Sequence, residues 1–550
     1  MANVKINRKL FEKEIGKLDE RMQDKISLMG TPVYSINDEE IEIEIYPNRP
    51  DLLSYHGFKR AFLAFLGKEG RIKEYKASPP KKDYQIIVDS SLKGIRPYTA
   101  CAIVTDLKLD NDKIKEIIEI QEKLHLTLGR RRKKLAIGIY PLERIKLPIT
   151  FKAVDPEKIR FKPLDSEREM SGFEILERHP AGKEYASLLA GKQKFPVFID
   201  ADEKILSMPP IINSDLTGRV DEGTKEVFIE CSGFDFEILK KCLNILVVAL
   251  ADMGGKICQM ELKYSKKETT PDLILEKMKL SLENVNKLLG IKLKEIDLKN
   301  LLEKMGHKYS NKIVEIPAWR IDIMHEVDLI EDIAIAYGYD NFEAEIPPIS
   351  TIGEEDRKEE IKRKISEIIS SLGFIEVSNY HLTTKNNQFS NMGLQDRQIK
   401  DFIEIVGSKT EYNILREDLS HYLMNVLSEN VDAEYPQKIF EIGKTFSNES
   451  KGIMERENLS IALSPGNFTE TKQIIEYLRI MTSVSLALKE PKSAPGWFIE
   501  GRTAEILFEG EKIGFIGEIH PKVLSNWKIR MPVALFEINI NKILEKLSNE

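Results

Sequence analysis

Residues Pro317 to Phe342 read PAWRIDIMHEVDLIEDIAIAYGYDNF and place a run of acids at the start of an expected helix. Three of the acids are three and four residues apart, so they span about 100° of one helix face. A fourth acid, Asp322, lies six residues before Asp328. The four acids are Asp322, Asp328, Glu331 and Asp332. The opposite face is apolar and is expected to pack inward, and Gly338 can end the helix.

Two interpretations of these acids stay open on spacing alone. Four carboxylates near one helix start suit a hard cation such as Mg²⁺, which prefers oxygen ligands. Acids in a first helical turn also interact favourably with the helix dipole and are common on solvated faces. Ile335 falls on the acidic side of the helix. A purely solvated face rarely carries such a residue, so we expect that face to be partly covered.

The composition favours a multidomain globular protein of a reducing compartment. The chain has 550 residues, 42% of them hydrophobic and 31% charged, with a formal net charge of −7. This length exceeds what one core organises, so we expect three or four domains. The negative balance argues against RNA binding over the whole surface. Four cysteines without a CxxC pair, a charged start and no run of about 20 apolar residues favour a cytoplasmic protein.

Three linker-like stretches, at residues 77–83, 265–272 and 346–355, divide the sequence. They predict an α+β multidomain protein with four parts. These are an N-terminal α/β segment, an α+β domain, a small helical domain, and an antiparallel sheet with helices. The expected boundaries are 1–82, 83–266, 267–346 and 347–550.

Several nucleotide and hydrolase motifs are absent from the sequence. No two glycines are separated by a single residue, which excludes GxGxxG, and GxxxxGK[ST], HExxH and GxSxG are also missing. The usual glycine-lined phosphate sites are therefore not expected. A chain of this length without them suggests part of a larger enzyme rather than its ATP-consuming part.

The motifs PxWRxDI, DLIED and YGYDN occur in this order within residues 317–342. This combination resembles the B5 domain of phenylalanine–tRNA ligase beta subunits. The resemblance implies Mg²⁺ at Asp322, Asp328, Glu331 and Asp332. Many members have glutamate where Asp332 stands, and aspartate reaches less far. Other stretches resemble the shorter, archaeal and eukaryotic cytosolic type along the whole chain: residues 42–61, 206–213, 227–235, 414–419, 440–446 and 501–506.

The resemblance implies a subunit of an α2β2 enzyme that joins phenylalanine to tRNA(Phe) with ATP. The aminoacylation site is then expected in the alpha subunit. Residues 347–550 are expected to form a degenerate class II synthetase fold that serves as scaffold and subunit interface. Residues 83–266 are expected to be a B3/B4-type editing domain that hydrolyses misacylated Tyr-tRNA.

The resemblance also implies which residues carry editing. Glu230 lies on the apolar stretch Val227–Cys231 and is the candidate for binding the tyrosyl hydroxyl. Ser207 and Ser232 are expected near the scissile ester, and Phe198 on the pocket wall. Many members have threonine and leucine at the positions of Ser232 and Phe198, which leaves the pocket size open. Without the resemblance, Glu230 is more simply a solvent-facing residue of an edge strand.

Two other functions remain possible at this point, a free-standing tRNA deacylase and a non-catalytic RNA-binding scaffold. The basic run Arg130–Lys134 is either a solvated loop or a contact for tRNA phosphates. His125 and His325 have no second ligand at metal spacing. Trp319 and Tyr339 either stack on a base or belong to the core.

Overall fold

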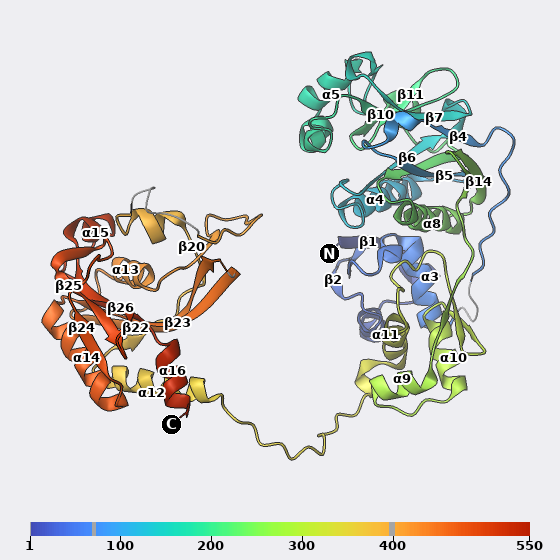
Figure 1. Cartoon of the computed structure of the whole chain (residues 1–550). Coiled ribbons are helices and arrows are strands. Elements are labelled where there is room, and N and C mark those ends of the chain that lie inside the picture. The colour runs from blue at the N-terminus through green and yellow to red at the C-terminus, as the bar shows by residue number, and fades with distance from the viewer. Residues whose placement is uncertain (1, 69–72, 395–401, 451, 550) are drawn as a thin grey trace. The chain divides into compact units, whose positions relative to one another are not determined.

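The computed structural model describes residues 2–68, 73–394, 402–450 and 452–549. The chain divides into two compact units, Met1–Ile346 and Pro347–Glu550, which Figure 1 shows in colours that run along the sequence. Among the described residues, no helix is long and apolar enough to cross a membrane.

The N-terminal segment has a three-stranded sheet in the order β1-β3-β2. In β3 the residues Ile41, Ile43 and Ile45 are buried and the intervening glutamates face away, as the period-two pattern of residues 40–45 predicts. The elements are β1 (Ala2–Asn7), α1 (Arg8–Glu14), α2 (Glu20–Leu28), β2 (Val33–Ile36), β3 (Glu40–Ile45) and α3 (Tyr55–Phe65).

A ten-stranded sheet follows, with the path β12-β11-β10-β7-β4-β14-β5-β13-β6 and β15 paired to β14. Its strands are β4 (Gln85–Val88), β5 (Tyr98–Thr105), β6 (Leu135–Pro141), β7 (Ile149–Val154), β10 (Phe195–Ile199), β11 (Ile205–Met208), β12 (Ile212–Asn213), β13 (Val227–Gly233), β14 (Lys256–Lys263) and β15 (Lys267–Thr270). Its principal helices are α4 (Asn111–Leu126) and α8 (Phe236–Asp252). The hairpin of β14 and β15 continues past the expected boundary at residue 266.

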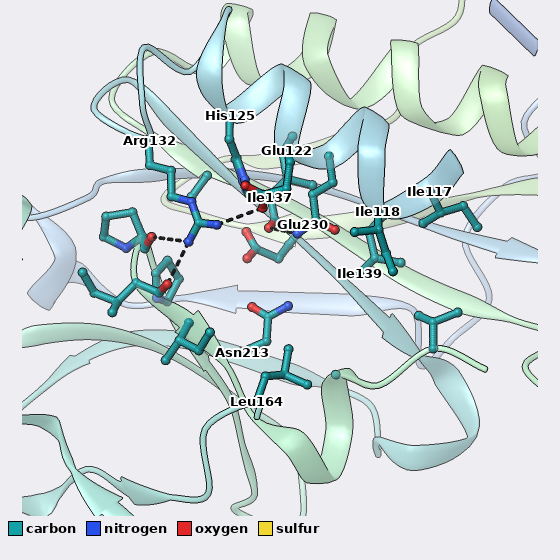
Figure 2. Close-up of a pocket in the computed structure, with 18 of the residues that line it drawn as sticks. Ile117, Ile118, Glu122, His125, Arg132, Ile137, Ile139, Leu164, Asn213 and Glu230 are labelled. Atoms are coloured by element: carbon teal, nitrogen blue, oxygen red, sulfur yellow. Dashed lines mark hydrogen bonds and ion pairs between the residues drawn. The ribbon is translucent and has the colours of Figure 1, made fainter. Parts of the chain in front are cut away.

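The two ends of this strand path approach each other. The Tyr140 hydroxyl, on β6, lies 3.3 Å from Asn213 Oδ1, on β12. Arg132, just before β6, donates a hydrogen bond of 2.8 Å to the carbonyl of Ile211. A cavity lies between these two ends and is closed on another side by α4 (Figure 2).

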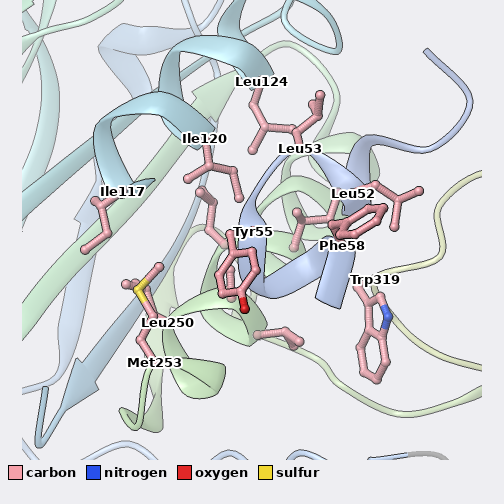
Figure 3. Close-up of a cluster of buried hydrophobic side chains, with 14 of the residues drawn as sticks. Leu52, Leu53, Tyr55, Phe58, Ile117, Ile120, Leu124, Leu250, Met253 and Trp319 are labelled. Atoms are coloured by element: carbon pink, nitrogen blue, oxygen red, sulfur yellow. The ribbon is translucent and has the colours of Figure 1, made fainter. Parts of the chain in front are cut away.

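The N-terminal segment shares one hydrophobic core with the ten-stranded sheet rather than forming a core of its own. Figure 3 shows Leu52, Tyr55 and Phe58 of the first segment in one cluster with Leu124 of α4, Leu250 of α8 and Trp319. Burial of these side chains provides the main driving force for their association. Residues 1–82 are therefore integrated into the first unit.

The third part of the first unit packs three helices on a three-stranded sheet in the order β16-β18-β17. Strands β17 and β18 form a hairpin, and β16 pairs with the other edge of β18. Gly290 ends the first helix in the left-handed conformation that favours glycine. The elements are β16 (Glu276–Lys279), α9 (Leu282–Leu289), α10 (Glu295–Lys304), β17 (Lys308–Ser310), β18 (Ile313–Ile316) and α11 (Glu326–Tyr337).

The second unit contains a seven-stranded, mostly antiparallel sheet in the order β19-β22-β23-β27-β26-β25-β24. Its strands are β19 (Ile375–Glu376), β22 (Gln437–Glu449), β23 (Gly452–Ser464), β24 (Leu486–Lys489), β25 (Phe498–Phe508), β26 (Glu511–Ile519) and β27 (Ala534–Asn539). Its helices include α12 (Arg357–Ser371), α13 (Ser420–Glu429), α14 (Phe468–Thr482) and α16 (Asn541–Asn549). Strand β19 is short, and beyond it Asn379 donates hydrogen bonds to the Glu441 carboxylate rather than joining the ladder.

Candidate functional site

Glu230 occupies a central strand of the ten-stranded sheet. Strand β13 pairs on one side with β5 and on the other with β6, and Glu230 lies opposite Cys101 and Gly138. The side chain is only 1% exposed. The alternative of a solvent-facing glutamate on an edge strand is therefore wrong. A buried carboxylate in a central strand requires a polar partner or a function.

Burial dominates the electrostatics of Glu230. Loss of hydration raises the pKa of its carboxyl to about 8, although Arg96 and the hydroxyls of Ser232 and Tyr140 act in the opposite direction. Burial lowers the pKa of Arg96 to about 10, so this guanidinium stays charged at neutral pH. Within the described part of the chain, Glu230 Oε2 is buried and has no hydrogen-bond partner. Such an atom is expensive to leave unpaired.

A glycine and a tyrosine define the space around this carboxylate. The Tyr140 hydroxyl lies 3.4 Å from Glu230 Oε1. A Cβ atom on Gly138 would lie 2.7 Å from the same oxygen and 2.1 Å from the Tyr140 hydroxyl. A larger residue at position 138 would therefore displace both groups, and the glycine keeps the cavity open beside Glu230.

The cavity in front of Glu230 has a volume of about 600 Å³, in the range of sites for small molecules. Its walls are mixed: an isoleucine-rich part lies beside polar and charged side chains, among them Glu230, Asn213, Glu122 and Arg132. Figure 2 shows the side chains of Glu230 and Asn213 facing the cavity space. The apolar wall is formed by Ile117, Ile118, Ile137, Ile139, Ile211 and Ile212. The arrangement suits an apolar group that carries one polar end.

The other three predicted editing residues lie next to the cavity without lining it. Ser207 faces Phe198 and Asn213 across strand pairs, and its buried Oγ has no hydrogen-bond partner among the described residues. Ser232 accepts a hydrogen bond of 3.0 Å from Arg96. Phe198, on β10, stacks on Phe151 at 4.1 Å and is not among the cavity residues, so its placement does not support a role as pocket wall.

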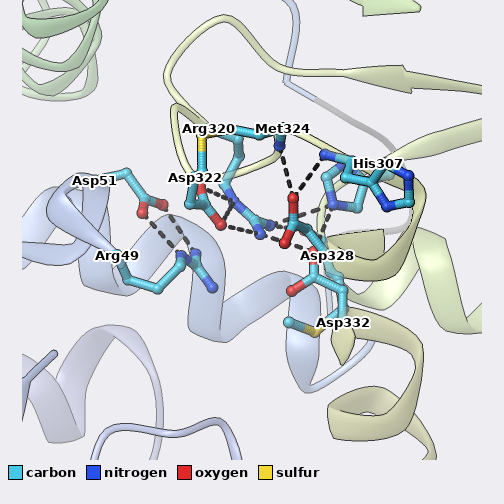
Figure 4. A network of polar contacts seen from close by, with 10 residues as sticks. Arg49, Asp51, His307, Arg320, Asp322, Met324, Asp328 and Asp332 are labelled. Carbon is cyan, nitrogen blue, oxygen red and sulfur yellow. Dashed lines mark hydrogen bonds and ion pairs between the residues drawn. The ribbon is translucent and has the colours of Figure 1, made fainter. Parts of the chain in front are cut away.

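The acids of the signature region are engaged with a buried arginine (Figure 4). Arg320 donates hydrogen bonds to Asp322 at 2.8 Å and to Asp332 at 2.7 Å. His307 Nε2 lies 2.7 Å from the same oxygen of Asp332. Burial alone would raise the pKa of Asp332, but the Arg320 guanidinium and His307 hold it well below its usual range. Asp332 therefore faces the core rather than a solvated acidic face.

The other two acids have separate positions. Asp328 accepts hydrogen bonds of 2.7 Å from the backbone N–H groups of Met324 and His325 and so caps α11. Glu331 is exposed. Carboxylate oxygens suit Mg²⁺ chemically. Yet nowhere in the described ranges do three His, Cys, Asp or Glu side chains converge as a metal would need. The four acids in this arrangement do not fit a shared ion.

Comparison with known proteins places the chain in a family. A beta subunit of phenylalanine–tRNA ligase from Thermococcus sibiricus is 41% identical over 501 residues, covering 89% of this chain and 88% of that protein. The beta subunit from Archaeoglobus fulgidus is 37% identical over 97% of each chain. This chain belongs to the phenylalanine–tRNA ligase beta-subunit family. The resemblance inferred from residues 317–342 is thus confirmed, and the chain has the role of a beta subunit of an aminoacyl-tRNA synthetase.

Models of domain families match two parts of this beta subunit. Residues 278–339 match the tRNA synthetase B5 domain, and residues 343–540 match the phenylalanyl-tRNA synthetase beta chain CLM domain. A crystal structure of an N-terminal fragment of the Pyrococcus horikoshii beta subunit is 38% identical. It covers 61% of this chain and 99% of the fragment, with a TM-score of 0.58. The mixed α/β, multidomain architecture is therefore shared with that relative.

The sequence indicates no cavity role for three polar residues that line the beta-subunit cavity. Glu122, His125 and Arg132 lie at its edge, where Arg132 donates to Glu122 at 2.9 Å. His125 Nε2 accepts the Ile137 backbone N–H at 2.8 Å, so Nδ1 carries the proton and donates to Glu122. Burial lowers the pKa of His125, which keeps the ring neutral. Because both ring nitrogens are engaged, His125 supports the cavity wall and has no free nitrogen for catalysis.

Trp319 and Tyr339, the two aromatic residues of the signature region that are candidates for base stacking, differ in exposure. Trp319 is 7% exposed, packs edge-on against Tyr75 and lies under the guanidinium of Arg60 at 4.8 Å. It belongs to the core and is not available to stack on a base. Tyr339, in contrast, is 55% exposed.

Proposed function

We propose that this beta subunit proofreads by hydrolysing tyrosine that has been attached to tRNA(Phe) by mistake. The observation that carries the proposal is Glu230 Oε2, which is buried and has no hydrogen-bond partner among the described residues, beside a cavity of about 600 Å³ with an isoleucine-rich wall. Tyrosine and phenylalanine differ by one hydroxyl. An apolar synthetic site rejects an added hydroxyl by only about 10²-fold, so a second, hydroxyl-selective site has a purpose.

Selectivity in this cavity would arise from hydrogen bonding to the carboxyl of Glu230. A tyrosyl hydroxyl pairs with Oε2, whereas a phenylalanyl ring leaves Oε2 buried and unpaired. Leaving a buried polar group unsatisfied costs roughly 1–3 kcal/mol, or about ten- to a hundredfold in preference. The isoleucine walls then hold either aromatic ring, and only the hydroxyl decides between them.

Hydrolysis in this cavity is assigned to an ordered water. The water adds to the ester carbonyl, the bond to the ribose oxygen breaks, and that oxygen takes up a proton. The nearby serines do not form a nucleophile–base pair, since Ser232 is bound by Arg96 and His125 has no free ring nitrogen. Ser207 pairs across the strands with Asn213 but does not line the cavity, so it could orient the water or the ester only after a local rearrangement.

We further propose that the chain assembles with an alpha subunit as an α2β2 enzyme in the cytoplasm and that the alpha subunit holds the ATP-dependent aminoacylation site. The absence of GxG sequences supports this division, because residues 347–550 lack the GxGxxR motif of a working class II site. That unit then serves as scaffold and interface.

Co-expression with an alpha subunit tests this assignment against its rivals. We expect phenylalanine attachment only when both chains are present and co-purify, together with hydrolysis of preformed Tyr-tRNA. A stable lone chain that removes tyrosine but never supports aminoacylation would indicate a free-standing deacylase. Assembly without ester hydrolysis in any assay would indicate a non-catalytic scaffold. Either result would overturn the proposal.

Mg²⁺ bound by Asp322, Asp328, Glu331 and Asp332 stays a prediction from the family resemblance and requires these side chains to rearrange. We expect the assembled enzyme, dialysed against Mg²⁺, to retain one ion that Asp328→Asn lacks. Asparagine keeps the capping hydrogen bonds of residue 328 but removes its charge. The exposed Asp340→Asn is the matched control. Equal metal content in parent and Asp328→Asn, measured by elemental analysis, would contradict the site.

A further inference from the structure

The segment Arg130–Lys134 joins α4 to β6 and has the sequence RRRKK. Three successive residues, Arg130, Arg131 and Arg132, have left-handed backbone conformations with φ of 47°, 54° and 60°. Such conformations are unfavourable for residues other than glycine, asparagine and aspartate. A run of three is held only where the surrounding structure imposes it, and such sites concentrate at functional positions.

Hydrogen bonds attach this basic loop to the end of α4. The backbone N–H of Arg132 donates to the His125 carbonyl, and that of Lys134 donates to the Gly129 carbonyl at 2.9 Å. A Cβ atom on Gly129 would lie 2.6 Å from the His125 carbonyl oxygen, so glycine is needed for this close turn. The loop is thus a built feature with a defined backbone.

Arg132 turns inward from this loop and fixes it to the cavity. Its guanidinium donates to the Ile211 carbonyl, pairs with Glu122 and lies 4.5 Å from the centre of the Tyr185 ring. Ile211, Glu122 and Arg132 all line the cavity. The loop therefore borders the cavity that contains Glu230.

The remaining four side chains, Arg130, Arg131, Lys133 and Lys134, are exposed. In the part of the chain that the structure describes, no carboxylate forms an ion pair with any of them, and the nearby Glu122 already pairs with Arg132 and His125. Four uncompensated cations in five residues stand out on a chain with a formal net charge of −7. Attraction to the carboxyl end of α4 does not account for them, because the helix dipole acts only over the last turn.

We propose that the exposed cations of Arg130–Lys134 bind backbone phosphates of the tRNA acceptor strand while its aminoacylated end occupies the Glu230 cavity. The inference rests on the proposed editing function. A polyanion must approach the cavity for its 3′ end to enter, and phosphate contacts by lysine and arginine position nucleic acids without reading sequence. The inward Arg132 couples the loop to the cavity edge.

The test replaces Arg130 and Arg131 together by asparagine in the complete enzyme with its alpha subunit. Asparagine removes both charges and tolerates the left-handed backbone, so the loop keeps its conformation. Lys133→Ala with Lys134→Ala is the second variant. Lys81→Asn with Lys82→Asn, two exposed cations ahead of β4 that do not line the cavity, is the matched control.

In the loop variants we expect kcat/KM for hydrolysis of preformed Tyr-tRNA to fall about tenfold at moderate salt, because KM rises while kcat is unchanged. In a plot of log(kcat/KM) against the logarithm of salt concentration, the slope should become less negative by about 1.4, the value for two lost phosphate contacts on a single strand. Hydrolysis of tyrosyl-adenosine, which has no phosphate, should match the parent enzyme.

Three results would overturn the inference. The first is an unchanged salt dependence of kcat/KM in both loop variants. The second is an equal loss of kcat/KM with tyrosyl-adenosine as substrate. The third is a loss of alpha-subunit assembly with unchanged tRNA affinity, which would make the loop a protein interface. If the parent enzyme hydrolysed no Tyr-tRNA, the proposed function would fail. Direct tRNA binding by parent and variant, followed by fluorescence anisotropy, would still decide the role of the loop.

Discussion

Replacement of Glu230 by alanine is expected to reduce hydrolysis of preformed Tyr-tRNA by roughly 100-fold, because the tyrosyl hydroxyl loses its buried partner. Formation of Phe-tRNA should be unchanged, since Glu230 lies in the ten-stranded sheet and aminoacylation is assigned to the alpha subunit. Single-turnover deacylation of Tyr-tRNA, measured beside steady-state phenylalanine attachment with the same preparation, separates the two activities.

Two further variants control the Glu230 experiment. Glu230→Gln keeps the size of the side chain and an acceptor oxygen, so it should retain more activity than alanine. Glu237→Ala removes a mostly exposed glutamate of α8 and should behave as the parent. If Glu230→Ala hydrolysed Tyr-tRNA at the parental rate, Glu230 would have no role in editing. The cavity would then lack the group to which selectivity is assigned.

Replacement of Arg320 by alanine is expected to destabilise the first unit by about 3–5 kcal/mol. Arg320 is buried and pairs with Asp322 and Asp332, and its loss leaves Asp332 with a buried negative charge that has lost its ion-pair partner and keeps a hydrogen bond to His307. Urea denaturation, combined with hydrogen exchange of peptides from α11 and the hairpin of β17 and β18, measures the change where it occurs.

The control for Arg320 is an arginine of the same unit with a weak surface pair. Arg178→Ala should change stability by less than about 0.5 kcal/mol, because Arg178 is 57% exposed and pairs with Glu174 at the surface. Arg320→Lys should be intermediate or close to alanine, since lysine cannot pair with two carboxylates in the same planar geometry. A loss below about 1 kcal/mol for Arg320→Ala would show that the network does not organise this region.

The sequence singles out Glu230 as a candidate but does not indicate its surroundings. A single carboxylate on an otherwise apolar strand is a local signal, visible within residues 227–231. Arg96 and Tyr140 give no such signal, because they lie 136 residues from Ser232 and 90 residues from Glu230 along the chain. The strand pairing that brings them together, with β13 between β5 and β6, is a property of the tertiary fold.

The acids of residues 322–332 show a different limit of sequence reasoning. Helical spacing correctly places apolar residues such as Ile330 and Ile333 inward. It also assigns Asp332 to a solvated or metal-binding face, whereas Asp332 is 4% exposed. Its burial depends on Arg320 and on His307, which enters from before β17. Periodicity alone cannot show that a charged residue finds a partner inside.

The most direct measurement compares hydrolysis of Tyr-tRNA and Phe-tRNA by the assembled parent enzyme and by Glu230→Ala under identical conditions. Selective editing at the Glu230 cavity predicts that the parent removes tyrosine at least about tenfold faster than phenylalanine and that the preference falls in Glu230→Ala. Equal rates for the two esters in the parent, or a preference that the substitution leaves intact, would contradict editing at this cavity.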